Sequence, residues 1–512
     1  MADTSRTMNT VRNVSWSIAG KILTLIMAFA SRTVFIYCLG TVYLGVNGLF
    51  ENVLSILSFT ELGIGTAMNY SLYKPVAEGN REKVRSLMHA YKIAYRVIAC
   101  IIAGLGLALL PWLDVFVKGT EGIGDIRVYY LLFLFNTVSS YFVTYKYGLV
   151  NAEQKNYILT NIDAACRAVI TIIQIIALLV FRNFLIYLLI QTFVQLLQKI
   201  FTAFYLNRRY PYLSCDSYKE IDSETKHSLI VNIKALVFHQ IGSICVYQTD
   251  YLLISTFINV GIVGLVSNYQ LLINSVNSFL MLAMTGVISS IGNLVATEKI
   301  EKQIQVFKAY DFCGFWLYSF ETIAFAVLAE PFITLWIGQD KLIDSLSWYL
   351  ILVNMYFVGQ RAASFHFETA AGIFDPGKYA SIVQAVINLA VSIYGVNHWG
   401  LPGIYIGTIV SGTVISIWKP YVLYHYQFHR SSISYFIRLA RNTCVTFAII
   451  VLMFFIRKFV IADLNYLTFA VLFILTGIIP NLIIALCFWK TDSMRYVLGR
   501  VQMILKRRLG HA

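Results

Sequence analysis

Long apolar runs constrain this chain more than any other feature. Fourteen runs of 17 or more residues contain few charged positions, and a run of that length crosses the roughly 30 Å hydrocarbon core of a bilayer as a helix. They cover approximately 14–39, 42–70, 93–113, 126–148, 157–181, 184–206, 229–256, 260–293, 309–337, 346–370, 379–397, 403–426, 436–456 and 465–489. These runs are continuous and not alternating, which argues against a transmembrane β-barrel. Because a lipid-embedded backbone must satisfy its own hydrogen bonds, the sequence predicts an all-α polytopic membrane protein with about fourteen spans.

Composition excludes a soluble protein of this size. Hydrophobic residues make up 58% of the chain and charged residues 13%, against roughly 25% charged residues in soluble domains. The net charge of +14 would indicate a nucleic-acid partner in a soluble chain, but here no such partner is expected. The eight cysteines show no CxxC spacing, which predicts neither a metal site nor a disulfide framework.

The distribution of lysine and arginine predicts the orientation. The two termini and the connections after the even-numbered runs together carry 28 of the 40 Lys and Arg residues. The connections after the odd-numbered runs carry six, and the remaining six lie within the runs. Cytoplasmic segments are enriched in these cations. The bias therefore predicts cytoplasmic termini, a cytoplasmic connection at 207–228 and an even number of spans.

The connections are too short for a soluble catalytic domain. The longest non-cytoplasmic loop, 114–125, has about a dozen residues, and no GxxxxGK[ST] motif occurs in the chain. The sequence therefore predicts a protein that is not an enzyme and needs no cofactor.

A weak internal repeat predicts the domain organisation. At an offset of 216 residues, the Gly-x-x-Gly segment of 45–48 aligns with that of 261–264. Each unit would contain six helices, which keeps the two copies parallel. We expect an N-lobe at 1–206, a basic linker at 207–228, a C-lobe at 229–430, and two added helices with a basic tail at 431–512.

Charged side chains inside the first two runs are candidates for function, because a charge at the bilayer centre costs roughly 2.5–3.5 kcal/mol on insertion scales. Lys21 and Arg32 share one face of the first run, where they would line a cavity or reach the two membrane interfaces. Glu51 and Glu61 share a polar face of the second run. These carboxylates would pair with the two cations, bind a coupling ion or accept hydrogen bonds from sugar hydroxyls.

Three later runs carry further candidates. Asp250 shares a polar face of the seventh run. In the tenth run, Arg361 lies close to mid-span on the same face as Glu368, so it would either bind an anion or pair with that carboxylate. The eighth run presents uncharged polar groups, Asn274 and Asn277 among them, which suit either a polyhydroxylated ligand or polar helix packing.

Several short stretches resemble the Wzx-type polysaccharide repeat-unit flippases of the multidrug/oligosaccharidyl-lipid/polysaccharide exporter (MOP) superfamily. They are Tyr43-Leu44-Gly45-Val46-Asn47-Gly48-Leu49-Phe50, Glu61-Leu62-Gly63-Ile64-Gly65, Tyr73-Lys74-Pro75, Thr249-Asp250 and Ser267-Asn268-Tyr269. The resemblance covers most of the chain and agrees with the fourteen predicted spans. Its last motif adds Asn268 to the candidate substrate-binding asparagines.

This resemblance implies a V-shaped, two-lobed transporter of the bacterial cytoplasmic membrane. Such a protein moves an undecaprenyl-pyrophosphate-linked oligosaccharide from the cytoplasmic to the outer leaflet by alternating access, for capsular, exopolysaccharide or O-antigen-like assembly. Its partners would be membrane lipids and a polysaccharide polymerase. Family members have a cationic central cavity, and Lys21, Arg32 and Arg361 are the positions that could supply it here. The alternatives are a lipid II flippase, a multidrug or cation antiporter of the same superfamily, and a receptor or scaffold.

Overall fold

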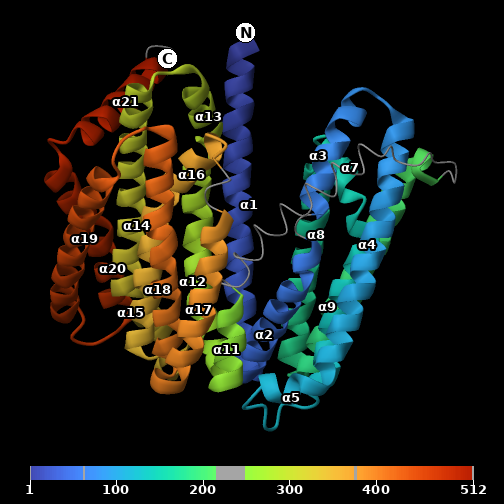
Figure 1. Cartoon of the computed structure of the whole chain (residues 1–512). Coiled ribbons are helices and arrows are strands. Elements are labelled where there is room, and N and C mark those ends of the chain that lie inside the picture. The colour runs from blue at the N-terminus through green and yellow to red at the C-terminus, as the bar shows by residue number, and fades with distance from the viewer. Residues whose placement is uncertain (1, 62–63, 215–247, 374–377, 510–512) are drawn as a thin grey trace. The chain divides into compact units, whose positions relative to one another are not determined.

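The computed structural model describes residues 2–61, 64–214, 248–373 and 378–509. Every regular element in these ranges is helical, from α1 to α21 (Figure 1). Eleven of the helices within them are long and apolar enough to cross a membrane. The chain is therefore an all-α polytopic membrane protein, and each of the fourteen predicted runs overlaps a helix in the described ranges.

Packing divides the chain into two compact units, Met1–Gly264 and Leu265–Ala512. Their boundary falls in the first turns of α12 (Val260–Thr285). The predicted linker at 207–228 lies largely within 215–247, outside the described residues. The expected four-part division of the chain therefore stays a prediction.

Unit 1 consists of long helices joined by short helical turns. They are α1 (Ala2–Leu39), α2 (Thr41–Leu57), η1 (Ser58–Glu61), α3 (Ile64–Ala77), α4 (Arg81–Leu109), η2 (Leu110–Trp112), α5 (Leu113–Phe116), α6 (Ile126–Thr144), α7 (Tyr147–Ala152), α8 (Tyr157–Phe181), α9 (Phe184–Arg209), η3 (Pro211–Ser214) and α11 (Thr249–Phe257). Three long helices begin at a polar cap whose side chain accepts a backbone N–H, at Asn80, Asp125 and Asn183. Such caps fix where each helix starts, because they satisfy donors that have no partner within the helix.

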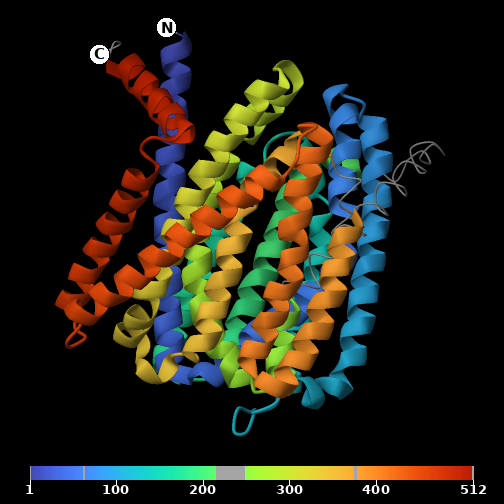
Figure 2. The ribbon, with the colours of Figure 1, turned by 60° about the vertical axis from the view of Figure 1, so that its left-hand side comes forward.

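The connections of unit 1 separate into two ends (Figures 1 and 2). The connections after α3 and α7 and the end of α9 share one cavity, described below. At the other end, the backbone of Lys118, in the loop before α6, bonds to Ser255 and Val260. This separation agrees with the predicted alternation of the connections, and the cytoplasmic assignment of the first end stays a prediction.

Two glycines bring α2 into backbone contact with the first turn of α12. A Cβ at Gly45 would overlap the carbonyl oxygen of Val260, and a Cβ at Gly264 would overlap that of Thr41. Small residues allow such close approach between membrane helices. Both glycines belong to the Gly-x-x-Gly segments of the predicted repeat, so the two related segments pack directly on each other.

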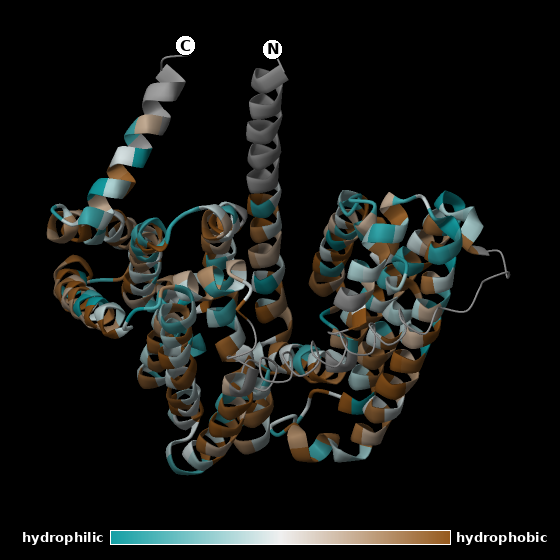
Figure 3. Ribbon diagram, turned by 45° about the horizontal axis from the view of Figure 1, so that its top comes forward, coloured by the Kyte–Doolittle hydropathy of each residue, from teal (hydrophilic) through white to brown (hydrophobic). Residues whose placement is uncertain are grey.

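Among the described residues, unit 2 is built from the rest of α12 and eleven further helical segments. They are α13 (Ile288–Thr297), α14 (Ile300–Ile337), η4 (Gln339–Lys341), α15 (Ser345–Gln360), α16 (Ala362–Ala370), α17 (Lys378–Trp399), α18 (Leu401–Val422), the π-helical turn η6 (Leu423–Gln427), α19 (Ile433–Val460), α20 (Tyr466–Phe488) and α21 (Asp492–Leu509). Figure 3 shows hydrophobic residues along the long helices of each unit and hydrophilic residues gathered at helix ends and connections.

Aromatic packing and a close contact between two glycines stabilise unit 2. Phe312 and Phe488 join α14 to α20 in a core that also contains Met494 of α21. On α17 and α18, Gly395 and Gly403 lie backbone against backbone, so that a Cβ on either would overlap the other residue. Close packing of small residues stabilises helix pairs in lipid, where no hydrophobic effect drives them together.

Candidate functional site

A polar cavity of about 420 Å³ lies among the helices of unit 1. It is lined by Glu51, Leu54, Ser55, Ser58, Glu61, Phe133, Asn136, Thr137, Ser140, Tyr141, Gln191, Gln195 and Lys199. These residues come from α2, η1, α6 and α9. Polar side chains inside membrane spans are costly unless they face an interior or a wet space, so we take this cavity as the candidate functional site.

The predicted polar face of the second run forms one wall of the cavity. Glu51, Ser55, Ser58 and Glu61 follow one another at helical spacing through α2 and η1, and all four line it. Glu51 Oε1 accepts a hydrogen bond from the side-chain amide of Asn47 at 3.1 Å. The structure therefore places both predicted carboxylates in one site.

Glu61 is held at the cavity wall by two tyrosines. Its carboxylate is hydrogen-bonded to the hydroxyls of Tyr95 on α4 and Tyr141 on α6. The two rings lie 6.2 Å apart between centroids. The two hydroxyls therefore hold the Glu61 side chain between α4 and α6.

Lys199 supplies the cation that lines the cavity. Its ammonium donates to the carbonyl oxygen of Asn136 at 2.7 Å and to the hydroxyl of Ser139 at 2.8 Å. Asn136 in turn donates to Thr192 Oγ1 at 2.9 Å. Lys199 is thus fixed between α9 and α6, and both of these hydrogen-bond partners are neutral.

Arg32 lies close to the carboxylate of Glu51. Arg32 on α1 interacts electrostatically with Glu51, Tyr187 and Tyr251, and Glu51 interacts in the same way with Arg167 of α8. Arg32 and the predicted acid Glu51 therefore lie near enough to interact electrostatically, and an ion pair between these two helices stays a prediction.

Two other predicted residues of unit 1 do not line this cavity. Lys21 lies half-buried on α1, about three helical turns from Arg32 along the axis. Asp250, in the first turn of α11, has an Oδ1 atom that is shielded from solvent and accepts no hydrogen bond within the described part of the chain. Whether either residue binds a coupling ion or substrate stays a prediction.

The three predicted asparagines of α12 have different surroundings. Asn268 is fully buried, and neither side-chain amide atom has a hydrogen-bond partner among the described residues. Asn274 is exposed and accepts a hydrogen bond from Gln270 at 2.9 Å, and Asn277 is half-buried. Asn274 and Asn277 are therefore accessible to a ligand in this conformation, whereas Asn268 is not.

Arg361 and Glu368 have separate partners in unit 2. Arg361 lies where α15 ends and α16 begins, and its Nη1 donates to the Gly412 carbonyl and the Ser416 hydroxyl of α18, each at 3.1 Å. Glu368 instead forms an ion pair with Lys419 at 2.6 Å. The pairing of Arg361 with Glu368, one alternative from the sequence, is therefore not formed, and each of the two side chains contacts α18 instead.

Sequence reasoning missed the wall of the cavity that α9 provides. Gln191, Gln195 and Lys199 recur every four residues along α9. That spacing puts them on one helix face, so a helical-face comparison of the sixth run would have found them. Within the described residues, no three His, Cys, Asp or Glu side chains gather as a metal-ligand set.

Comparison with known proteins places the fold. No protein-family model matches the chain, and no curated protein matches it. Among solved structures, the lipid II flippase MurJ in its inward closed conformation is 16% identical, with 93% of this chain and 99% of that chain covered and a TM-score of 0.61.

Two MATE transporters are similar as well. An inward-facing MATE family transporter of the MOP superfamily is 14% identical to this chain, with a TM-score of 0.58. The matched region covers 77% of this chain and 92% of that transporter. The MATE transporter VcmN of Vibrio cholerae is 14% identical, with coverage of 84% and 99% and a TM-score of 0.55. The chain therefore has the fold of MOP-superfamily transporters, and at these identities the likeness defines the fold alone.

Proposed function

We propose that this protein is a flippase that moves undecaprenyl-pyrophosphate-linked oligosaccharide repeat units from the cytoplasmic to the outer leaflet of a bacterial cytoplasmic membrane. The observation that carries this proposal is the polar cavity of unit 1, where Lys199 of the long apolar helix α9 and the carboxylates Glu51 and Glu61 of α2 and η1 lie among amides and hydroxyls. Both termini are cytoplasmic in this proposal, and the product serves capsular, exopolysaccharide or O-antigen-like assembly.

The chemistry of the cavity suits the three parts of such a substrate. The pyrophosphate carries ionised oxygens that Lys199 and Arg32 would attract, since cations recognise phosphate by charge-assisted hydrogen bonds. The side-chain amides of Gln191 and Gln195 offer donors and acceptors for sugar hydroxyls. The polyprenyl tail stays in the bilayer and needs no polar contact.

The proposed activity is translocation and not catalysis. Alternating access exposes one binding site first to the cytoplasmic and then to the outer leaflet, and the substrate shifts the balance between these two states only through its differential affinity for them. Arg32, Arg361, Lys21, Asn274 and Asn277 remain proposed substrate contacts, and Asn268 would become one only in another conformation of the cycle. A polysaccharide polymerase remains the proposed downstream partner.

One observation favours a second candidate function. Glu51 and Glu61 place two carboxylates in the same cavity, and intramembrane acids also mark proton and cation pathways. A multidrug or cation antiporter of the same fold therefore remains the alternative, together with a flippase for lipid II, whose chemistry is of the same class.

Deletion of the gene tests the proposal in the native cell. We expect lipid-linked oligosaccharide to accumulate on the cytoplasmic leaflet, where an impermeant glycan-modifying enzyme added to intact cells does not reach it. Expression of Lys199→Gln should leave the accumulation in place, whereas Lys458→Gln, an exposed lysine at the end of α19, should relieve it. A deletion strain that makes no lipid-linked intermediate, or that exports polymer normally, would overturn the proposal.

A further inference from the structure

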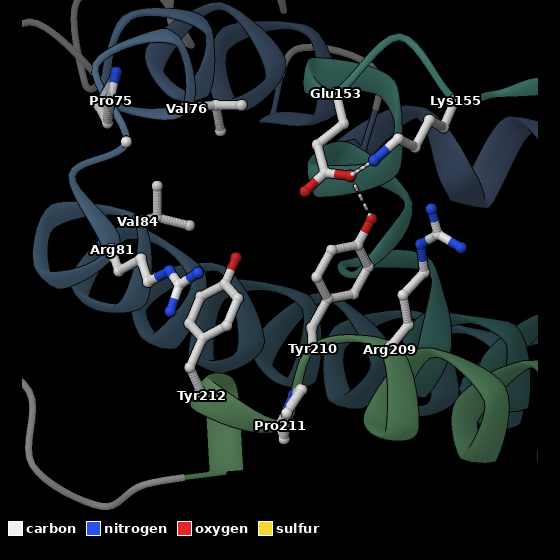
Figure 4. Close-up of a pocket in the computed structure, with 11 residues that line it drawn as sticks. Pro75, Val76, Arg81, Val84, Glu153, Lys155, Arg209, Tyr210, Pro211 and Tyr212 are labelled. Atoms are coloured by element: carbon white, nitrogen blue, oxygen red, sulfur yellow. Dashed lines mark hydrogen bonds and ion pairs between the residues drawn. The ribbon is translucent and has the colours of Figure 1, made fainter.

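A second cavity lies at the end of unit 1 where three connections meet (Figure 4). It measures about 510 Å³ and is lined by residues from the end of α3, the start of α4, the α7–α8 connection and the end of α9. Ligand pockets commonly span roughly 300–1,000 Å³, so it has room for a diphosphate and part of an attached group. None of its lining residues belongs to the cavity described above.

The carboxylate in this cavity is already satisfied. Glu153 Oε2 accepts hydrogen bonds from Lys155 Nζ at 2.7 Å and from the hydroxyl of Tyr210 at 2.9 Å (Figure 4). Among the described residues, the guanidinium groups of Arg81 and Arg209 form no ion pair with a carboxylate. The cavity therefore carries an excess of positive charge.

Aromatic rings position both guanidinium groups. Arg81 lies over the ring of Tyr212 at 5.7 Å, and Arg209 lies 6.0 Å from the ring of Tyr210 and donates to Tyr205 Oη at 3.2 Å. A guanidinium that packs on a ring keeps an N–H edge free for a bidentate acceptor, which matches phosphate geometry. Burial raises the pKa of the Tyr212 hydroxyl, so this group stays protonated and able to donate.

We propose that this cavity binds the diphosphate group of a lipid-linked substrate and holds it at the cytoplasmic end of unit 1 before translocation. This proposal rests on the proposed function and on the predicted orientation of that end. Arg81 and Arg209 contact the two phosphates, and the Tyr212 hydroxyl donates a further hydrogen bond. A free diphosphate offers the same chemistry, so the test must distinguish the lipid from a soluble anion.

Calorimetric titration of the purified full-length protein with inorganic pyrophosphate tests recognition of the anion. The double variant Arg81→Gln, Arg209→Gln should bind at least tenfold more weakly, since each lost charge-assisted bond costs roughly tenfold. Arg208→Gln is the matched control, because Arg208 is the neighbouring residue, lies over the ring of Phe204 at 4.3 Å and does not line the cavity. An equal loss in the control, unchanged binding in the double variant, or no saturable binding to the unaltered protein would each overturn the site.

A second titration identifies the source of the diphosphate. Undecaprenyl pyrophosphate in phosphatidylcholine nanodiscs should displace pyrophosphate from the unaltered protein. Control nanodiscs that contain phosphatidylglycerol in place of undecaprenyl pyrophosphate should not displace it. Failure of the polyprenyl lipid to compete overturns the assignment to a lipid-linked substrate. If the double variant loses pyrophosphate binding but exports normally, the holding role is overturned while the flippase proposal stands, because the leaflet measurement in deletion cells tests the flippase separately.

Discussion

The ion pair between Glu368 and Lys419 gives a quantitative prediction about unit 2. The two charged atoms lie 2.6 Å apart, and the side chains are 2% and 16% exposed, respectively. Lys419 also lies over the ring of Phe365 at 5.3 Å. Removal of one member of a buried pair leaves the other charge unpaired and costs about 3–5 kcal/mol. Glu368→Gln and Lys419→Gln should therefore each lower the free energy of unfolding by about that amount, roughly a hundredfold or more in the folding equilibrium.

Reversible unfolding of the purified protein in mixed micelles measures these differences. The double substitution to glutamine should recover most of the loss, because two neutral amides need no charge compensation. Glu78→Gln serves as the control, since the Lys74–Glu78 pair spans 3.9 Å with side chains 86% and 53% exposed, and exposed pairs contribute about 0–1 kcal/mol. The reasoning fails if either buried single substitution matches this control, or if the double variant is as unstable as the sum of the singles.

Three further predictions concern packing, capping and topology. Gly395→Val should lower the melting temperature in detergent far more than Gly477→Val, because a Cβ at Gly395 would overlap Gly403 whereas one at Gly477 meets open space. Asn465→Ala should destabilise the protein by about 0.5–2 kcal/mol in denaturant unfolding, because Asn465 accepts the backbone N–H groups of two residues in the first turn of α20; no change would mean that solvent replaces this cap. Cys215, outside the described residues, should react with an impermeant maleimide only after the cells are opened, and labelling of intact cells would refute a cytoplasmic 207–228.

Most of the fold could be predicted from hydropathy, because a lipid environment permits few backbone solutions. The second and tenth runs show where this reasoning stops. Each was predicted as one continuous span, but the second passes through η1 near Ser58 and the tenth changes from α15 to α16 at Arg361. Hydropathy averages over such breaks, since it depends on the composition of the run and not on the path of the backbone.

The candidate site could be predicted only in part. The shared face of Glu51 and Glu61 is a property of one helix and follows from the period of the helix. The position of Lys199 against Asn136 joins residues 63 apart in sequence, and the pairing of Glu368 with Lys419 joins α16 to α18. Such partners depend on which helices are neighbours, and one sequence without its packing does not specify that.

Transport in a purified system tests the proposed flippase most directly. The protein would be reconstituted into liposomes with a fluorescent undecaprenyl-pyrophosphate-linked oligosaccharide, and an impermeant quencher would measure how fast the lipid changes leaflets. We predict that the unaltered protein and Lys458→Gln equilibrate the lipid between leaflets, and that Lys199→Gln does so at least tenfold more slowly at equal protein abundance. Equilibration no faster than in protein-free liposomes, or an unchanged rate in Lys199→Gln, would contradict the proposal that this cavity carries the substrate.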